Sequence, residues 1–214
     1  MPLRLYAATT NRGKVREFQQ MASSSSITND VEVLLLPAEH VLPEVEETGS
    51  TFAENARIKA LAYSRRLPDE LVFADDSGLC VNALDDAPGV FSARYASKAV
   101  AEGSTATMGA QSTDAANNTH LLQELAKLST NDRSAKFVCV ITAARNSIVI
   151  AEAEGIAEGE ILYAARGEEG FGYDPLFLYP ALNKSFAEMD QTEKAQHSHR
   201  GKAFRGLLSK LQNQ

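Results

Sequence analysis

The sequence predicts a mixed α/β fold, with helices flanking one central β-sheet. Two observations carry this prediction. Strand-like runs alternate with helix-like runs in the N-terminal half, as they do in strand–helix units. Further along, two β-rich runs at 137–143 and 148–153 are joined by the short link 145–147, which indicates an antiparallel hairpin. A sheet that combines both kinds of connection is mixed, and we expect it to be elongated.

The clearest single element is a helix at 51–66, because this segment is rich in Ala, Glu, Arg and Lys and ends before Pro68. The small, polar, Gly-containing segment 97–113 predicts a mobile surface insertion. The other expected elements are, in order, a strand at 3–8, a helix at 15–22, a small-residue linker at 23–26, a strand at 31–36, a Pro- and Glu-rich stretch at 37–47, strands at 71–74 and 79–81, a helix that Asp114 caps and that runs through Leu128, a strand at 176–178, and a helical C-terminal part from Thr192.

The composition is that of an ordinary globular protein and excludes several functions. With 214 residues, the chain is long enough for one large domain or two small lobes. A net charge of −7 argues against binding to nucleic acid or to an anionic membrane, because both reward a basic surface. No apolar run approaches the roughly 20 residues of a membrane span, and charged residues interrupt any N-terminal signal sequence. Cys80 and Cys139 lie in apolar runs, so we expect buried thiols and a cytoplasmic protein.

The most informative segment is Phe73-Ala74-Asp75-Asp76-Ser77-Gly78-Leu79. A short buried strand at 71–74 is expected to end here, and strand ends are where α/β proteins expose their chemistry. Two adjacent carboxylates at such a place need metal ions, protons or cations to neutralise them. Asp, Ser and Gly also form turns. Taken alone, the segment is explained about equally well by a turn and by a functional site.

A second polar segment, Thr9-Thr10-Asn11-Arg12-Gly13-Lys14, lies between the first strand and the first helix. Free backbone N–H groups and the positive end of the helix dipole favour an anion there. Gly13 permits close backbone approach, and Lys14 adds a positive charge. The segment is not a P-loop, because Ala8 replaces the first glycine and Val15 follows the lysine. A polar loop with a surface lysine is the simpler interpretation of this segment alone.

Two further segments carry weaker signals. Asn55 and Lys59 are four residues apart in the predicted helix and therefore share one face. Glu47, just before that helix, is either a metal ligand or a surface acid. Pro88 to Tyr95 combines a turn with a cation and an aromatic ring, which is a weak signal by itself.

Aromatic and cationic residues gather in the C-terminal part of the chain. In Gly170–Pro175, Phe171 lies between two glycines, and the proline favours an extended Asp174. Such a segment can stack on a base and offer it a carboxylate, although a tight turn with Phe171 in the core explains it nearly as well. Lys194–Lys202 holds five potentially cationic side chains in nine residues. Ser198 resembles an N-cap that places cations in a first helical turn, against the helix dipole. This suggests an acidic ligand or contact with a base edge, and a basic surface patch is the alternative.

Together these segments resemble the inosine triphosphate pyrophosphatase family, whose members hydrolyse noncanonical purine nucleoside triphosphates. Each segment alone is a weak signal, but the segments follow the family order and span nearly the whole chain. The chain departs from the family at Thr10, where many members have glycine, and in the longer segment 97–113. The matching segments are Thr9–Lys14, Thr51–Ala56 with Lys59, Ala74–Leu79, Pro88–Tyr95, Phe171–Pro175 and Ser198–Arg200.

The resemblance implies an elongated mixed sheet with flanking helices and two lobes around a nucleotide-binding cleft, with residues 1–214 as a single domain. It also implies a homodimer that requires Mg²⁺ and cleaves a nucleoside triphosphate to the monophosphate and pyrophosphate. By the same resemblance, Asp76 is the proton acceptor and a metal ligand, Glu47 is a second ligand, and Lys14 is catalytic. The implied substrate-binding residues are Thr9, Thr10, Asn11, Arg12, Gly13, Lys14, Lys59, Ser77, Phe171, Gly172, Tyr173, Asp174, Lys194, His199 and Arg200.

Two other functions remain open at this point. A nucleotide-binding module without catalysis would share the phosphate-binding and aromatic segments but would not need paired acids. Asp76-Ser77-Gly78 after an apolar strand also resembles the signature of an aspartic protease, although a mostly β protease would not need the predicted helices and cationic clusters. Magnesium-dependent release of pyrophosphate would separate a pyrophosphatase from both.

Overall fold

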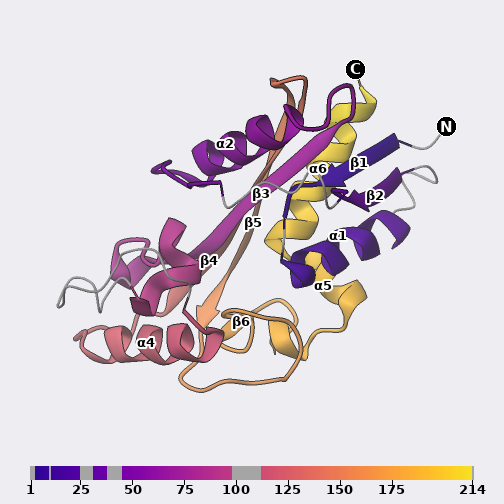
Figure 1. The fold of residues 1–214 in the computed structure, drawn as a ribbon. Helices are drawn as coiled ribbons and strands as arrows, with labels where there is room; N and C mark the ends of the chain where they lie inside the picture. Colours follow the sequence, from indigo (N-terminus) through magenta and orange to yellow (C-terminus); the bar gives the residue numbers. More distant parts are fainter. Residues whose placement is uncertain (1–2, 10, 25–30, 38–44, 98–111, 214) are drawn as a thin grey trace. The chain divides into compact units, whose positions relative to one another are not determined.

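The computed structural model describes residues 3–9, 11–24, 31–37, 45–97 and 112–213 (Figure 1). Within these residues, seven strands form one sheet in the order β2-β1-β3-β4-β5-β6-β7, with helices beside it. The predicted mixed α/β fold is confirmed. The elements are β1 (Leu3–Ala7), α1 (Arg12–Ser24), β2 (Val31–Leu35), α2 (Phe52–Ser64), β3 (Val72–Val81), α4 (Asp114–Ala126), β4 (Ser134–Arg145), β5 (Ile148–Ile161), β6 (Phe177–Tyr179), β7 (Lys184–Ser185), α5 (Gln191–His197) and α6 (His199–Gln212), with short 3₁₀ helices at Asn82–Leu84, Gly89–Arg94 and Phe186–Glu188.

The chain divides into two compact units, which we call unit 1 and unit 2. Unit 1 comprises residues 1–76, 139–156 and 191–214, and unit 2 comprises 77–138 and 157–190. In the described residues of unit 1, β1 pairs in parallel with both β2 and β3. In unit 2, β6 pairs antiparallel with β5 and with β7. The sheet is therefore mixed, as the sequence predicts.

The two faces of β3 in unit 1 pack against different helices, because successive side chains of a strand point to opposite faces. Phe73 lies on one face, and its ring centroid is 4.9 Å from that of Phe18 in α1 and 5.9 Å from that of Phe204 in α6. Val72 and Ala74 lie on the other face and belong to a second cluster with residues of α2. The two residues of β3 that follow within unit 1, Asp75 and Asp76, are thereby directed to the α1 and α6 side and to the α2 side, respectively.

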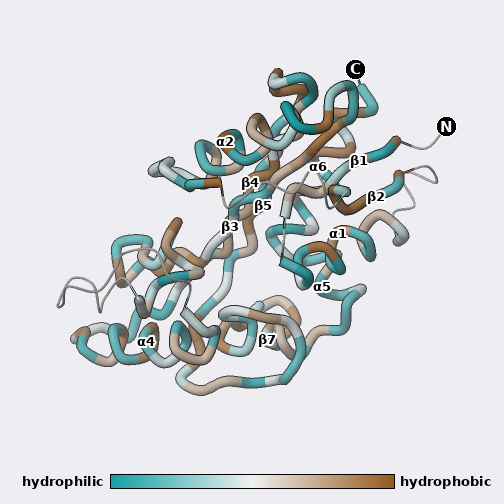
Figure 2. Tube along the Cα trace, viewed as in Figure 1, coloured by the Kyte–Doolittle hydropathy of each residue, from teal (hydrophilic) through white to brown (hydrophobic). Residues whose placement is uncertain are grey.

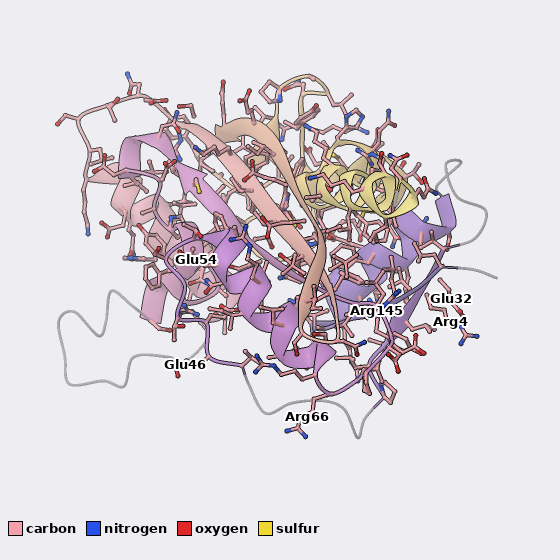
Figure 3. The ribbon with its side chains drawn as sticks, turned by 90° about the horizontal axis from the view of Figure 1, so that it is seen from above. Arg4, Glu32, Glu46, Glu54, Arg66 and Arg145 are labelled. Carbon is pink, nitrogen blue, oxygen red and sulfur yellow. The ribbon has the colours of Figure 1, made fainter. Side chains whose placement is uncertain are left out.

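The outer strands of unit 1 keep their register through backbone pairing, with Arg4 of β1 opposite Glu32 of β2. Figure 3 shows these two side chains beside one another, and Arg4 Nε lies 3.5 Å from a Glu32 carboxylate oxygen. Both side chains are about half exposed, so this ion pair adds little to stability. The core of the unit lies further in, on β1, β3 and β4.

The predicted hairpin is present, and its connection is shorter than the sequence suggests. Asn146 and Ser147 alone link β4 to β5, both with positive φ (51° and 63°). Two-residue hairpin turns need this left-handed conformation, which asparagine tolerates well. The strands extend to 12 and 14 residues. In β5 buried and exposed residues alternate. The strand therefore extends beyond the predicted range 148–153 although its later part is not a continuous hydrophobic run.

The core of unit 2 is built around three aromatic rings. Phe177 lies 4.7 Å from Phe137 and 4.8 Å from Phe186, measured between ring centroids. Leu121 and Leu125 of α4 are buried in the same cluster. The hydropathy along α4 alternates accordingly between hydrophilic and hydrophobic (Figure 2). One face of this helix is thus fixed in the core, and its other faces are available for polar contacts.

Three predictions about local structure need correction or lie outside the described residues. No turn follows Ala74, because β3 continues through the two aspartates to Val81. Thr113, and not Asp114, is the N-cap of α4, since its side chain accepts a hydrogen bond from the backbone N–H of Ala116. Most of the predicted insertion at 97–113 falls outside the described residues. Among the described helices, none combines the length and the apolar character needed to cross a bilayer.

Candidate active site

The centre of the candidate site is the pair of aspartates inside β3. Asp75 and Asp76 are only 3% and 7% exposed, so bulk water solvates neither carboxylate and other groups must balance its charge. By strand alternation, Asp75 shares the face of Phe73, which packs on α1 and α6, while Asp76 shares the face of Ala74, which packs beside α2. Two neighbouring acids thus meet two different sets of partners.

Asp75 is held by cations from α1 and α6. Its Oδ2 lies 2.9 Å from Lys14 Nζ and 3.5 Å from Arg200 Nε. Burial alone would raise the pKa of Asp75, but the charges of Lys14 and Arg200 outweigh it and hold this pKa below the ordinary value. Asp75 is therefore a permanent anion whose function is to orient two cations. The sequence indicates the acid but does not indicate this role.

Glu17 is a second anion, half-buried, and it is absent from the sequence-based set. It accepts a hydrogen bond from Arg200 Nη1 and lies 2.7 Å from Lys194 Nζ. Burial would raise the pKa of Glu17, yet the charges of Arg200 and Lys194 lower it. Glu17 lies three residues after Lys14 on α1, so both share one helix face. That spacing is the signal in the sequence that could have identified it.

The first turn of α6 is built as the sequence predicts. Ser198 is the N-cap and accepts a hydrogen bond from the Gly201 N–H at 3.1 Å. His199 and Arg200 follow, buried at 4% and 3% exposure. Burial and the adjacent charge of Arg200 hold the pKa of His199 well below its ordinary value, so its imidazole is neutral. The helix packs so closely that a Cβ added to Gly155 of β5 would overlap the backbone oxygen of His199.

Asp76 meets residues of α2 and the segment before it. Lys59 Nζ bridges two carboxylates, at 3.2 Å from Asp76 Oδ1 and 2.7 Å from Glu47 Oε1. Burial, with the nearby negative charge of Glu47, raises the pKa of Asp76, and the charge of Lys59 offsets this only in part. The pKa of Lys59 is raised despite burial, because Asp76, Asp75 and Glu47 surround it. Asp76 is thus a stronger proton acceptor than an ordinary aspartate.

Asn55 orients Asp76 and is fully buried. Its Nδ2 donates to Asp76 Oδ2 at 3.1 Å, while its Oδ1 accepts from the Gly49 N–H at 2.8 Å. A Cβ at Gly49 would lie 2.6 Å from that Oδ1, so only glycine fits this approach. The predicted common face of Asn55 and Lys59 is confirmed, since both reach Asp76. Asn55 is nevertheless missing from the residues that the sequence assigns to the site.

The predicted anion-binding segment before α1 differs from the expectation. Asn11 Oδ1 accepts hydrogen bonds from the backbone N–H groups of Gly13 and Lys14, at 2.9 and 3.1 Å. The sequence predicts that these N–H groups are free to bind an anion. The structure shows that they are already hydrogen-bonded. Thr9 Oγ1 in turn accepts from the Asn11 N–H. Arg12 begins α1 and is exposed, and Thr10 lies outside the described residues.

The remaining predicted residues belong to unit 2. Ser77 is half-buried in β3. Asp174 is buried, and its Oδ2 accepts a hydrogen bond from the Phe171 N–H at 2.8 Å. This bond stabilises a turn that includes residues 172–176, and the predicted extended backbone at Asp174 itself stays a prediction. Gly170 and Gly172 both have positive φ, which explains why the segment carries glycine at these two positions. The roles of all these residues in binding stay predictions.

The two carboxylates that meet Lys59 have the chemistry expected of a Mg²⁺ site. Mg²⁺ prefers oxygen ligands and commonly uses one or two protein carboxylates together with substrate phosphates. Glu47 and Asp76 already share one cationic group, so they lie close enough to share another. Within the described residues no cluster of three or more potential ligands occurs. The donor set fits a metal that is completed by a phosphorylated substrate.

The opposite environments of the two aspartates predict opposite effects on stability. Asp75→Asn leaves the buried Arg200 and the half-buried Lys14 without their shared anion, so we expect the free energy of unfolding to fall by about 3 kcal/mol or more. Asp76→Asn removes a charge that folding disfavours, as the raised pKa shows, and should leave this free energy unchanged or higher. Urea unfolding followed by circular dichroism measures both. Equal losses in the two variants would contradict the assignment.

Comparison with known proteins identifies the family of this chain. The model of the Ham1 family matches residues 5–210. A dITP/XTP pyrophosphatase of Acidobacterium capsulatum is 47% identical over 212 residues, which cover 99% of each chain. One of Thermus thermophilus is 43% identical over 206 residues, covering 96% of this chain and 90% of the relative. The solved structure of a HAM1 protein from Coxiella burnetii, 38% identical, superposes with a TM-score of 0.81 over 99% of this chain and 100% of that one. The protein belongs to the Ham1 family.

Proposed function

We propose that this protein hydrolyses noncanonical purine nucleoside triphosphates, namely ITP, dITP and XTP, to the nucleoside monophosphate and pyrophosphate. The observation that carries the proposal is the buried Asp76, whose pKa is raised beside the Lys59 and Glu47 side chains. A carboxylate with a raised pKa is a better general base than one with the ordinary pKa of an exposed aspartate. Relatives that are 43–47% identical over nearly the whole chain are named dITP/XTP pyrophosphatases.

Asp76 accepts the proton of the attacking water in this proposal. Asn55 and Lys59 each bind one of its oxygens, so the carboxylate cannot rotate freely and little reorganisation is needed before it accepts a proton. The water oxygen forms a bond to the α-phosphorus, and the bond from this phosphorus to the bridging oxygen breaks. The reaction consumes one water and yields a monophosphate and pyrophosphate.

Lys14 and Lys59 neutralise the charge that grows on the departing pyrophosphate. Asp75 fixes the position of the Lys14 ammonium at 2.9 Å, so little reorganisation is needed when substrate binds. Glu47 and Asp76 would hold Mg²⁺, which supplies Lewis-acid stabilisation of the phosphate oxygens when it is bound. Thr9 to Lys14 contribute to triphosphate binding through their side chains more than through the backbone groups that Asn11 occupies.

The proposed nucleoside-binding residues are Ser77, the segment Phe171–Asp174, Lys194 of α5, and His199 and Arg200 of α6. Lys194 and Arg200 are held by Glu17, and His199 is neutral. Fixed N–H donors suit the 6-oxo group of hypoxanthine and xanthine, whereas the 6-amine of adenine would leave such a donor buried and unpaired. The homodimer, the cytoplasmic location and the cleft between two lobes stay predictions.

The base assignment predicts that Asp76→Asn loses at least ~10²-fold in kcat for ITP. The variant keeps the shape of the side chain and should remain folded. Asp85→Asn is a matched control, because Asp85 is exposed and has a positive φ that asparagine tolerates. Magnesium-dependent pyrophosphate release measures the rates. An Asp76→Asn variant with more than about a tenth of the wild-type kcat would exclude a general-base role.

Substrate choice is the second prediction of the proposal. The wild-type protein should release pyrophosphate from ITP, dITP and XTP far faster than from ATP and GTP, by up to ~10⁴-fold where a site is built around a hydrogen bond. Guanine also has a 6-oxo group, so its rejection must arise at the 2-amine. A panel of the five triphosphates measures kcat/KM. Equal values for ITP and ATP would contradict the proposal, and binding without pyrophosphate release would indicate a nucleotide-binding module.

A further inference from the structure

We infer that α4 is a positioning element for the nucleoside-binding segment, and that Asp114 and Asn118 perform this role. Asp114 Oδ2 accepts a hydrogen bond from the Gly172 N–H at 2.7 Å, and Asn118 Nδ2 donates to the Gly172 carbonyl oxygen at 3.0 Å. We call these two hydrogen bonds the Gly172 clamp. The inference rests on the proposed function, in which Phe171–Asp174 bind the nucleoside. All of these residues belong to unit 2.

The clamped segment is one that would otherwise be costly to order. Gly172 in this segment, and Gly167 and Gly170 just before it, all have positive φ, between 63° and 81°. Glycine loses more conformational freedom on folding than any other residue. If the segment became ordered only when substrate arrived, that entropy would be subtracted from binding. A clamp that acts before binding transfers the cost to folding.

The helix that supplies the clamp is itself firmly held. Leu121 and Leu125 fix one face of α4 in the aromatic core of unit 2. Asn117 is 3% exposed, and its side chain accepts from the Ala96 N–H and donates to the Ala93 carbonyl oxygen. Asp114 and Asn118 are four residues apart and therefore lie on one helix face. They offer an acceptor and a donor to the two peptide groups that flank a single residue.

The neighbours of Gly172 are anchored separately, which leaves a defined part of the segment for a ligand. Tyr173 is 4% exposed, and its hydroxyl donates to the Ser92 carbonyl oxygen at 2.9 Å. Phe171 is half-buried, and its N–H donates to Asp174. A Cβ added to Gly172 would meet nothing within 4 Å. Gly172 is thus clamped through its backbone and open on the side where a side chain would stand, so a ligand can approach there.

These contacts predict an effect on substrate binding more than on the chemical step. The Asp114→Ala/Asn118→Ala double variant should raise KM for ITP about tenfold and change kcat less than about threefold. The reason is that the lost contacts stabilise the bound substrate and the transition state equally. Asp114→Asn keeps an acceptor for the Gly172 N–H and should stay within about threefold of wild type. Gln123→Ala, an exposed position on the same helix, is the matched control.

A second readout follows the segment without any turnover. The chain contains no tryptophan, so Phe171→Trp creates a single fluorescent reporter in the segment. In this background, removing the clamp should lower the fluorescence anisotropy of the substrate-free protein, because the ring becomes more mobile. Asn118→Ala alone serves if the double variant does not fold. A role limited to stability would change the melting temperature and leave anisotropy and KM unchanged.

The outcomes separate the clamp from the proposed function. Unchanged KM and anisotropy in the folded clamp variants would overturn the clamp while leaving pyrophosphate release by the wild-type protein intact. An Asp114→Asn variant as impaired as the Asp114→Ala/Asn118→Ala double variant would also overturn it, since charge and not hydrogen bonding would then matter. If the wild-type protein releases no pyrophosphate from any triphosphate, the proposed function fails, and the anisotropy still decides whether α4 holds the segment.

Discussion

The structure of unit 1 depends on one interaction, the burial of Asp75 between Lys14 and Arg200. A buried carboxylate is unfavourable unless cations surround it, and here α1 and α6 each supply one. The same cations would be unfavourable without the acid, since Arg200 lies in the first turn of α6 against the helix dipole. Glu17 completes the balance by binding Arg200 and Lys194. Charge neutrality therefore determines how the two helices sit on β3, and it fixes the residues proposed to bind substrate.

The adjacent Asp76 has a different function because the strand directs it to the other face. There Lys59 is the cation in direct contact with it, and Glu47 adds a second negative group. The result is a carboxylate with a raised pKa next to one with a lowered pKa. One acid can accept protons and the other cannot. A single strand with period-two alternation thus produces both a structural anion and a base from two consecutive residues of the same type.

The sequence predicts the features that depend on local chemistry. The second helix, the hairpin and the Ser198 cap are found because composition, turn residues and N-cap preference act over a few positions. The common face of Asn55 and Lys59 follows from helical spacing alone. The continuation of β3 through Asp75 and Asp76 could not be found in this way, because aspartate is depleted in strands. Here contacts distant in sequence override that preference.

The site residues that sequence reasoning missed also depend on contacts between positions far apart in the chain. Glu17 contacts Arg200 across 183 positions of the chain; its helical spacing from Lys14 indicates a shared face, but no local pattern identifies the distant partner. Asn118 and Gly172 are 54 positions apart. The sequence predicts that backbone N–H groups at the start of α1 bind an anion, but those of Gly13 and Lys14 donate to Asn11, only two and three positions away. In that case a local side chain competed with the expected anion, as asparagine often does at helix starts.

The central claim is that a water molecule attacks the α-phosphorus, so that pyrophosphate is the leaving group. Hydrolysis of ITP in ¹⁸O-labelled water, with mass spectrometry of both products, tests it most directly. The account predicts that the label enters the nucleoside monophosphate and that pyrophosphate stays unlabelled. Label in the pyrophosphate would place the attack on the β-phosphorus and contradict the account.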